Sequence, residues 1–362
     1  MNVFTVKWLR RALPACVALG LVMSGFAQAE TPNVAQDFFP DTKENRLLSQ
    51  KSYDHLLDVD KKHGHFIEVN GIKMHYLEWG DKNGVPLIWS HGYGSTGFEL
   101  LNVAPQLAAA GYHVYSITYR GFGQTQVADT NFSLSHVADD IVAMMDKLGI
   151  EKAVIGGLSL GGGVTTTFYE NYPERALALV LEDGGSDTNQ SRTETSFAVF
   201  KDLFSKMPSM DEQPIFKDRF SGLQALARQF NLPDIPFAVL TTLQSFVIPN
   251  GEGGYTRHDN RKKLWGLTQD TINPAMNHKV SLLQQSWRRI NPFITYRNLS
   301  VPMLIIDPTG DFLDLTAENE KLRDMHPDLI DLVLYPDTPH QAHPVRPEWF
   351  VRDMKTLLGR LK

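Results

Sequence analysis

Cysteine is nearly missing from this sequence, and so is any excess of basic charge. Cys16 is the one cysteine among 362 residues, so an intrachain disulfide is excluded. The 35 Lys and Arg residues are outnumbered by 41 Asp and Glu residues, which gives a net charge of −6. A nucleic-acid partner therefore has no electrostatic support, because such partners need a basic surface. Without disulfides, the fold must be held together by the packing of its hydrophobic residues, which make up 42% of the chain.

Long hydrophobic runs are missing as well, except near the N-terminus. Basic residues at positions 7–11 precede an apolar run over residues 12–26, and Ala-Gln-Ala follows at residues 27–29. This order is typical of a secretory signal peptide, and the run is shorter than the roughly twenty residues of a membrane span. We therefore expect cleavage after residue 29, export to the periplasm or the medium, and no membrane span in the mature chain. Since Cys16 would be removed, a thiol nucleophile and a cysteine-ligated zinc are excluded too.

Apolar strands alternate with amphipathic helices in two parts of the chain. The expected strands cover residues 66–69, 72–79, 85–89, 114–118, 153–156, 176–181, 301–306 and 329–335. The expected helices cover residues 133–148, 161–172 and 347–361. This alternation predicts a mostly parallel sheet with helices on both faces. The alternation stops over residues 186–299, a stretch too long for a loop, and its hydrophobic spacing predicts an inserted helical cap.

The sequence therefore predicts five consecutive parts. They are a signal peptide (1–29), an irregular polar N-terminal arm (30–60), the first part of an α/β core (61–185), the helical cap (186–299) and the second part of the core (300–362).

The sharpest chemical signal is Gly-Leu-Ser-Leu-Gly at residues 157–161. It follows an apolar strand directly and precedes a helix directly, which is the context that a nucleophile elbow requires. The turn between them would expose the hydroxyl of Ser159, and glycines flank it because side chains there would collide with the turn. We therefore predict that Ser159 is a catalytic nucleophile.

A serine hydroxyl needs a base, and the base needs a carboxylate that orients it. His340 follows the last strand and precedes the closing helix, so it can lie over the carboxyl edge of the sheet, and we predict that it is the base. Asp311, on the loop after the strand at 301–306, is the predicted acid because the order Ser, Asp, His is usual in enzymes with this motif. Asp183, at the end of the strand before the cap, stays open as an alternative, as do Asp307 and Asp314.

Backbone N–H groups must also stabilise the oxyanion that forms on the substrate. His91 and Gly92 follow a buried strand, and the N–H of Tyr93 can pair with that of Leu160 at the elbow. We predict these two N–H groups as the oxyanion hole, and we expect neither a metal nor a cofactor.

Taken together, these features resemble the α/β-hydrolase superfamily, over roughly residues 66–361. The matching motifs are His-Gly at residues 91–92, Arg-Gly-Phe-Gly at 120–123, the elbow at 157–161, and His340. The resemblance implies an α/β-hydrolase fold: a mostly parallel central sheet flanked by helices, with a helical cap inserted between strands 6 and 7. It assigns Ser159, Asp311 and His340 to the triad, and Tyr93 and Leu160 to the oxyanion hole.

Two positions depart from the family pattern. Pro308 stands where a glycine usually precedes the acid by three residues, which keeps Asp183 open as the acid. Thr118 stands where an aspartate is frequent. Haloalkane dehalogenases and epoxide hydrolases resemble the pattern but have aspartate at the elbow, whereas Ser159 implies an acyl-enzyme.

The expected activity is therefore that of a serine hydrolase that cleaves a carboxylic ester or a lactone. Numerous phenylalanines in residues 186–299 favour a hydrophobic substrate of moderate size. Three alternatives remain on the same fold: a peptidase similar to proline iminopeptidases, a carbon–carbon bond hydrolase, and a non-catalytic binding protein. The sequence leaves the oligomeric state open.

Overall fold

The computed structural model describes most of the chain. The described residues are 39–126, 132–187, 215–229, 235, 237–257, 272–273, 278–279, 282–309 and 313–361. The predicted signal peptide at 1–29 and the predicted acid Asp311 lie outside them.

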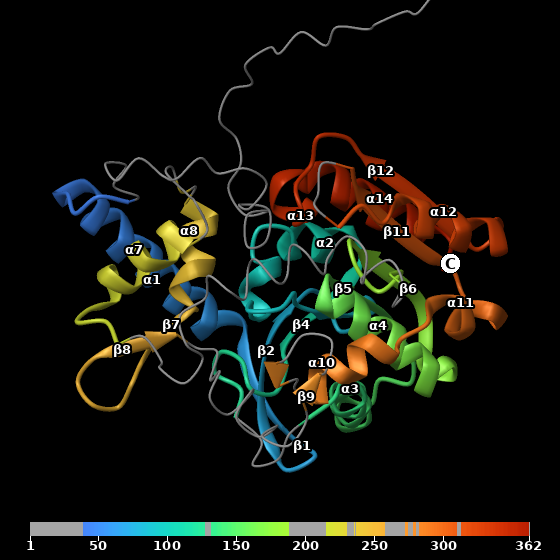
Figure 1. The fold of residues 1–362 in the computed structure, drawn as a ribbon, viewed down its shortest axis with the longest axis horizontal. Helices are drawn as coiled ribbons and strands as arrows, with labels where there is room; N and C mark the ends of the chain where they lie inside the picture. Colours follow the sequence, from blue (N-terminus) through green and yellow to red (C-terminus); the bar gives the residue numbers. More distant parts are fainter. Residues whose placement is uncertain are drawn as a thin grey trace, which may run out of the picture.

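An eight-stranded sheet forms the centre of the molecule (Figure 1). Its strands are β1 (Gly64–Val69), β2 (Ile72–Trp79), β3 (Val85–Ser90), β4 (Tyr112–Thr118), β5 (Ala153–Leu158), β6 (Ala176–Glu182), β11 (Met303–Pro308) and β12 (Ile330–Tyr335). Their order is β1-β2-β4-β3-β5-β6-β11-β12, and β2 is antiparallel to both of its neighbours. The strands from β4 to β12 run parallel, so their carboxyl ends meet at one edge. The predicted fold class is confirmed.

The hairpin at the antiparallel end of the sheet follows from its turn. Asn70 and Gly71 both have positive φ angles, of 44° and 76°, as the favoured two-residue hairpin turn requires. The turn pairs Val69 with Ile72, and the register continues to Gly64 opposite Leu77.

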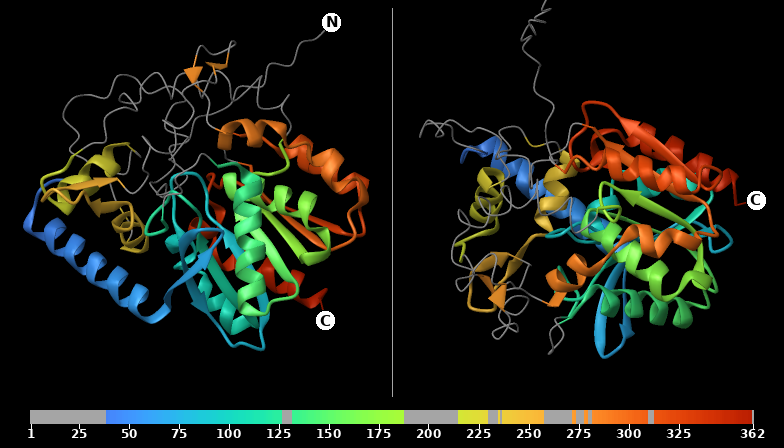
Figure 2. Two further views of the ribbon diagram at one scale, coloured as in Figure 1. Left: turned by 90° about the horizontal axis from the view of Figure 1, so that it is seen from below. Right: turned by 45° about the vertical axis from the view of Figure 1, so that its right-hand side comes forward.

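Helices cover both faces of the sheet (Figure 2). A hydrophobic cluster lies between the sheet and the helices on each face. On one face, α2 (Ala104–Ala110) and α14 (Pro347–Gly359) pack against the sheet. The other face carries α3 (Leu134–Leu148), α4 (Leu160–Asn171) and α12 (Thr316–Met325). Local sequence sets the ends of α3, since Ser133 caps its first turn and Gly149, with φ of 70°, ends it.

The expectation of an irregular arm over residues 30–60 is wrong from Lys43 onward. Helix α1 spans Lys43–His63 and begins at Thr42, whose hydroxyl accepts a hydrogen bond from the Asn45 N–H. Its buried positions are Ser49, Ser52, Leu56 and Val59. Because two of these four are serines, the hydrophobic spacing that normally reveals an amphipathic helix is weak here.

Parts of residues 186–299 form a unit beside the sheet, together with α1. Helices α7 (Arg219–Gln229) and α8 (Phe237–Gln244) share a third hydrophobic cluster with Phe39. A two-stranded sheet of β7 (Val247–Pro249) and β8 (Tyr255–Arg257) lies next to them (Figure 1). The assignment of all of 186–299 to one cap stays a prediction.

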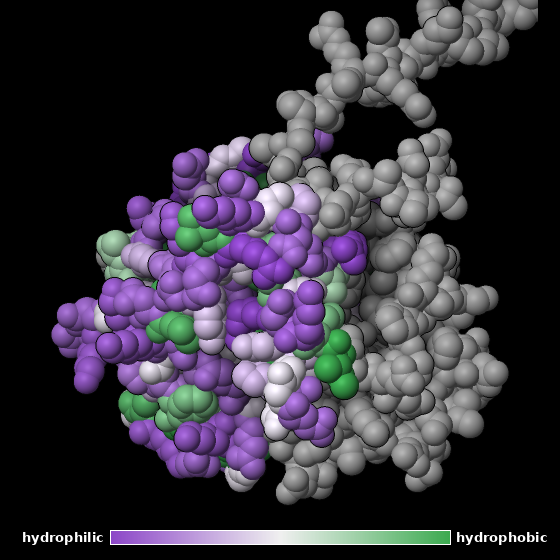
Figure 3. Space-filling model, turned by 90° about the vertical axis from the view of Figure 1, so that its left-hand side faces the viewer, coloured by the Kyte–Doolittle hydropathy of each residue, from purple (hydrophilic) through white to green (hydrophobic). Residues whose placement is uncertain are grey.

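Where the structure describes it, the face that carries α1, α7 and α8 is largely hydrophilic, with scattered hydrophobic side chains (Figure 3). Within the described part of the chain, no helix is long and apolar enough to cross a membrane.

Candidate active site

Ser159 lies in a strained turn between β5 and α4. Its φ of 55° and ψ of −114° fall outside the regions that residues with side chains normally adopt, at a cost of about 1–3 kcal/mol. The flanking glycines explain how the turn can form. A Cβ atom on Gly157 would overlap the backbone of Gly161, and one on Gly161 would overlap the carbonyl oxygen of Ser90. The predicted sharp turn between strand and helix is therefore present, and Ser159 at its centre is 9% exposed.

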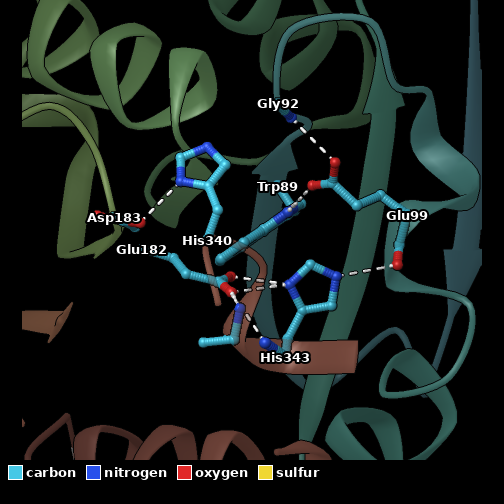
Figure 4. A network of polar contacts seen from close by, with 8 residues as sticks. Trp89, Gly92, Glu99, Glu182, Asp183, His340 and His343 are labelled. Carbon is cyan, nitrogen blue, oxygen red and sulfur yellow. Dashed lines mark hydrogen bonds and ion pairs between the residues drawn. The ribbon is translucent and has the colours of Figure 1, made fainter. Parts of the chain in front are cut away.

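His340 is paired with a carboxylate from β6. Its Nδ1 lies 2.7 Å from Oδ2 of Asp183, and both side chains are buried (Figure 4). Asp183 follows the last residue of β6 and has a positive φ of 46°, which Asp tolerates better than most residues. His340 lies on the loop between β12 and the short helix α13 (Ala342–Val345). With Nδ1 donating to the carboxylate, Nε2 of His340 is left in the form that can accept a proton.

The elbow and this pair lie at the same edge of the sheet. The Ser159 N–H donates to the Glu182 carbonyl oxygen at 2.8 Å, one residue before Asp183. Gly184, one residue after it, packs so tightly against Ser159 that a Cβ atom there would overlap the serine backbone. Backbone contacts on both sides of Asp183 therefore hold it against the elbow.

The other predicted acids are placed differently. Asp307 lies in β11, buried, and accepts a hydrogen bond from Asn319 Nδ2 at 3.1 Å. Asp314 lies in the segment that precedes α12 and has a φ of 44°. Asp311 remains a prediction outside the described residues. Asp183 satisfies the order Ser, Asp, His as well as Asp311 does, so that order alone could not choose between them.

The segment predicted to carry the oxyanion hole passes directly beside the elbow. Leu160 is the first residue of α4, and Tyr93 is the third residue after the end of β3. The end of β3 touches the elbow, since the space next to Gly161 is filled by backbone atoms of Ser90 and His91. The placement agrees with Tyr93 and Leu160 as donors, and their role stays a prediction.

Sequence reasoning missed a second buried polar group behind His340. It consists of Glu182, His343 and Glu99, and all three side chains are nearly inaccessible (Figure 4). Burial raises the pKa of Glu99. Burial works against the charged form of His343, but the carboxylates of Glu182 and Glu99 outweigh it and raise the pKa of His343. The one signal in the sequence is Glu182 itself, a charged residue that ends an otherwise apolar strand.

The described residues hold no group of three or more His, Cys, Asp or Glu side chains placed to bind a metal ion. The described side chains at this edge supply a hydroxyl from Ser159, an imidazole from His340 and a carboxylate from Asp183.

Comparison with known proteins places this geometry in a family. A model described as "alpha/beta hydrolase fold" matches residues 85–347. Bifunctional epoxide hydrolase 2 of Sus scrofa is 29% identical over 119 residues, which cover 32% of this chain and 21% of that protein. The chain therefore spans only about a fifth of that relative's length.

Two solved structures resemble the chain over most of its length. The E-2-(acetamidomethylene)succinate hydrolase structure has a TM-score of 0.63 at 20% identity and covers 82% of this chain and 98% of its own. Est816, described as an N-acyl homoserine lactone degrading enzyme, has a TM-score of 0.53 at 20% identity and covers 81% and 99%. These likenesses establish the fold, and the family match extends from β3 to the start of α14. The chain belongs to the α/β-hydrolase fold family.

Proposed function

We propose that this protein is a serine hydrolase that cleaves a carboxylic ester or a lactone through an acyl-enzyme on Ser159. One observation carries the proposal: a strained serine elbow lies at the same sheet edge as a buried His340–Asp183 pair. We assign His340 as the general base and Asp183 as the carboxylate that orients it. Tyr93 and Leu160 supply the oxyanion N–H groups.

The reaction follows from these assignments. Asp183 accepts the Nδ1 proton of His340 and so fixes the tautomer in which Nε2 carries a lone pair. Nε2 takes the proton of Ser159 as its oxygen attacks the acyl carbon, and the backbone N–H groups stabilise the resulting oxyanion. The protonated His340 then gives its proton to the leaving alcohol. Water, activated by the same imidazole, releases the acid from the serine.

The residue at the elbow separates this proposal from the epoxide-hydrolase branch. The family pattern implies an aspartate nucleophile in epoxide hydrolases and haloalkane dehalogenases, which forms an alkyl ester. Serine forms an acyl-enzyme instead, so the substrate must offer an acyl carbon. The likeness to Bifunctional epoxide hydrolase 2 therefore supports a hydrolase and not the opening of an epoxide.

We propose a hydrophobic substrate of moderate size because phenylalanines are numerous in residues 186–299. Phe220 and Phe246 are buried in the cluster shared by α7 and α8, so they stabilise that unit rather than face a ligand. The unit meets the core close to the oxyanion segment, where Thr96 Oγ1 and Ser245 Oγ lie 2.9 Å apart. A largely apolar cover at this place would exclude water from the acyl-enzyme. Lactones belong to the proposal because Est816, one of the similar folds, is described as acting on them.

We also propose that the chain is exported, because residues 1–29 have the order of charges and small residues of a signal peptide. Removal of these residues would leave 32 basic and 41 acidic residues. N-terminal sequencing of the protein recovered from the periplasm or the medium tests this: a chain that starts with Met1 contradicts it.

A fluorophosphonate probe tests the central claim, because such probes react with activated serines. We expect labelling of Ser159 in the folded protein and hydrolysis of p-nitrophenyl esters. Ser159→Ala and His340→Ala should each lower kcat on the order of 10⁶-fold with the fold intact. A folded protein that neither reacts with the probe nor turns over esters contradicts the proposal. Faster turnover of aminoacyl-naphthylamides than of esters would favour a peptidase instead.

A further inference from the structure

The group behind the proposed catalytic pair connects the loop of His340 to the segment of the oxyanion hole. Its members come from three separate elements: Glu182 ends β6, His343 lies in α13, and Glu99 lies in the 3-10 helix η2 (Gly97–Leu100). Figure 4 shows the ring of His343 between the Glu182 carboxylate and the backbone of Glu99, whose own carboxylate points to Gly92 and Trp89. Glu182 and His343 are 0% exposed, and Glu99 is 5% exposed.

Both ring nitrogens of His343 face oxygen atoms that accept hydrogen bonds. Nε2 lies 3.1 Å from the backbone carbonyl oxygen of Glu99, which can only accept, so Nε2 must carry a proton. Nδ1 lies 2.9 Å from Oε2 of Glu182. Oε1 of the same carboxylate accepts two backbone N–H groups, and we take the carboxylate as the hydrogen-bond acceptor of Nδ1 as well. Nδ1 must then carry a proton too, which makes the ring a buried imidazolium.

Glu182 fixes the backbone beside His340. Its Oε1 accepts the N–H of Ala342 at 2.7 Å and the N–H of His343 at 2.9 Å. The next residue, Asp183, binds the ring of His340. Two consecutive carboxylates at the end of β6 therefore hold one loop, Asp183 through the imidazole and Glu182 through the backbone.

Glu99 fixes the segment that leads to Tyr93. Its Oε2 accepts the N–H of Gly92 at 3.0 Å, and its Oε1 accepts the indole N–H of Trp89 at 3.3 Å. Since Gly92 directly precedes Tyr93, this carboxylate sets the direction of the peptide that carries the predicted oxyanion N–H. His343 reaches the backbone of the same glutamate, so one ring touches both loops.

We propose that Glu182, His343 and Glu99 are positioning residues, with His343 held as an imidazolium that ties the base loop to the oxyanion segment. The inference rests on the proposed serine hydrolase mechanism. His343 is not a second base, because a ring protonated on both nitrogens has no lone pair to offer. Its charge offsets the cost of burying the Glu182 carboxylate, with which Nδ1 pairs at 2.9 Å. The network then aligns the two parts of the site that must act on one acyl group.

The first experiment is ¹⁵N NMR of the histidines in the wild-type protein, which needs no activity. We expect a ring with protons on both nitrogens at pH 7.5, and we expect its signals to be missing in His343→Gln. If this ring instead has one unprotonated nitrogen at that pH, the proposal is wrong. Should His343→Gln not fold, His343→Asn provides the assignment.

The second experiment compares two Glu→Gln variants by ester kinetics. Glu182→Gln keeps the size and an acceptor oxygen but removes the charge, and we expect kcat to fall about 10²-fold with little change in KM. Glu78→Gln is the matched control, because Glu78 also pairs with a histidine, His113, at 2.6 Å, but at the opposite edge of the sheet. It should keep the wild-type kcat.

The outcomes separate this inference from the proposed function. A wild-type protein that reacts with the fluorophosphonate probe at Ser159 establishes the nucleophile, whatever the kinetics of Glu182→Gln are. If folded Glu182→Gln then labels and turns over at the wild-type rate, the positioning role is excluded while the serine mechanism stands. Equal losses in Glu182→Gln and Glu78→Gln would show a general effect on stability and would also overturn the role.

Discussion

At the scale of single residues, the choice of acid decides how the mechanism is assigned. Asp183 is bonded to His340 at 2.7 Å and is buried, so its charge can stabilise an imidazolium during catalysis. Asparagine has nearly the same shape, but its amide can hold the imidazole in the wrong tautomer. Replacing Asp183 with asparagine therefore tests the charge and the hydrogen-bond direction and leaves the packing intact.

We predict that Asp183→Asn lowers kcat for a p-nitrophenyl ester by about 10⁴-fold, with an unchanged circular dichroism spectrum. Asp311→Asn should change kcat little, because the Nδ1 atom of His340 already has its carboxylate. Steady-state kinetics of the two purified variants decides the matter. The reverse pattern, an active Asp183→Asn and an inactive Asp311→Asn, would identify Asp311, on the loop after β11, as the acid.

Sequence alone could single out Ser159 and His340 as candidates, because their positions follow from local context. Ser159 lies in a motif whose strand and helix can both be recognised, and His340 follows the last strand. The sequence leaves Asp183 open as an alternative acid, because its contact with His340 depends on how β6 lies beside β11 in the folded sheet. The pairing of Glu182 with His343 spans 161 residues, and no local pattern reveals such a contact.

At the scale of elements, the elbow between β5 and α4 depends on the absence of side chains. We predict that Gly161→Ala destabilises the protein by about 3 kcal/mol or more, because its methyl group would overlap the Ser90 carbonyl oxygen and force the backbone apart. Urea denaturation measures the change. Gly149→Ala is the control: nothing lies near its Cβ position, so only the positive φ of 70° opposes it, at about 1–2 kcal/mol. Equal losses would contradict the steric argument.

Helix α1 depends on one buried amide for its attachment to α8. Gln244 Nε2 donates to the Ser49 carbonyl oxygen and to Ser52 Oγ, both at 2.8 Å. Gln244→Leu would leave both acceptors buried without this donor, and we predict a loss of about 1–3 kcal/mol in the free energy of unfolding. Gln50→Leu, at an exposed position of the same helix, should change it by less than about 0.5 kcal/mol. Similar effects of both substitutions would show that the amide does not anchor α1.

These contacts also explain why α1 escaped prediction while the sheet did not. Strands β5, β6 and β11 are mostly apolar and buried because helices cover both faces of the sheet, and such runs are easily recognised. Helix α1 is held partly by polar contacts, since the buried Ser49 and Ser52 both accept hydrogen bonds from Gln244. A hydrophobic pattern cannot report contacts made by an amide nearly 200 positions away in the chain.

At the scale of the whole molecule, the buried group at Glu182, His343 and Glu99 couples stability to pH. The pKa of His343 is raised in the folded state by the two carboxylates, against the effect of burial, and burial raises the pKa of Glu99. In both cases the folded protein binds protons that the unfolded chain has released, so stability falls as the pH rises. The contribution of His343 is complete below its ordinary pKa of 6.5 and is lost as the pH passes its folded-state value.

We therefore predict that the free energy of unfolding decreases between pH 6.5 and pH 9, by about 1.4 kcal/mol for each unit by which the pKa of His343 is raised. Glu182→Gln should show a smaller decrease over this range, because the charge that contributes most to raising the pKa is removed. Urea denaturation at several pH values measures both proteins. A wild-type stability that is constant across this range, or an equally steep decrease in Glu182→Gln, would contradict a buried imidazolium.

A pH profile of kcat connects stability with activity. If His343 joins the two catalytic loops, the pH at which kcat is lost and the pH at which stability is lost should shift together in Glu182→Gln.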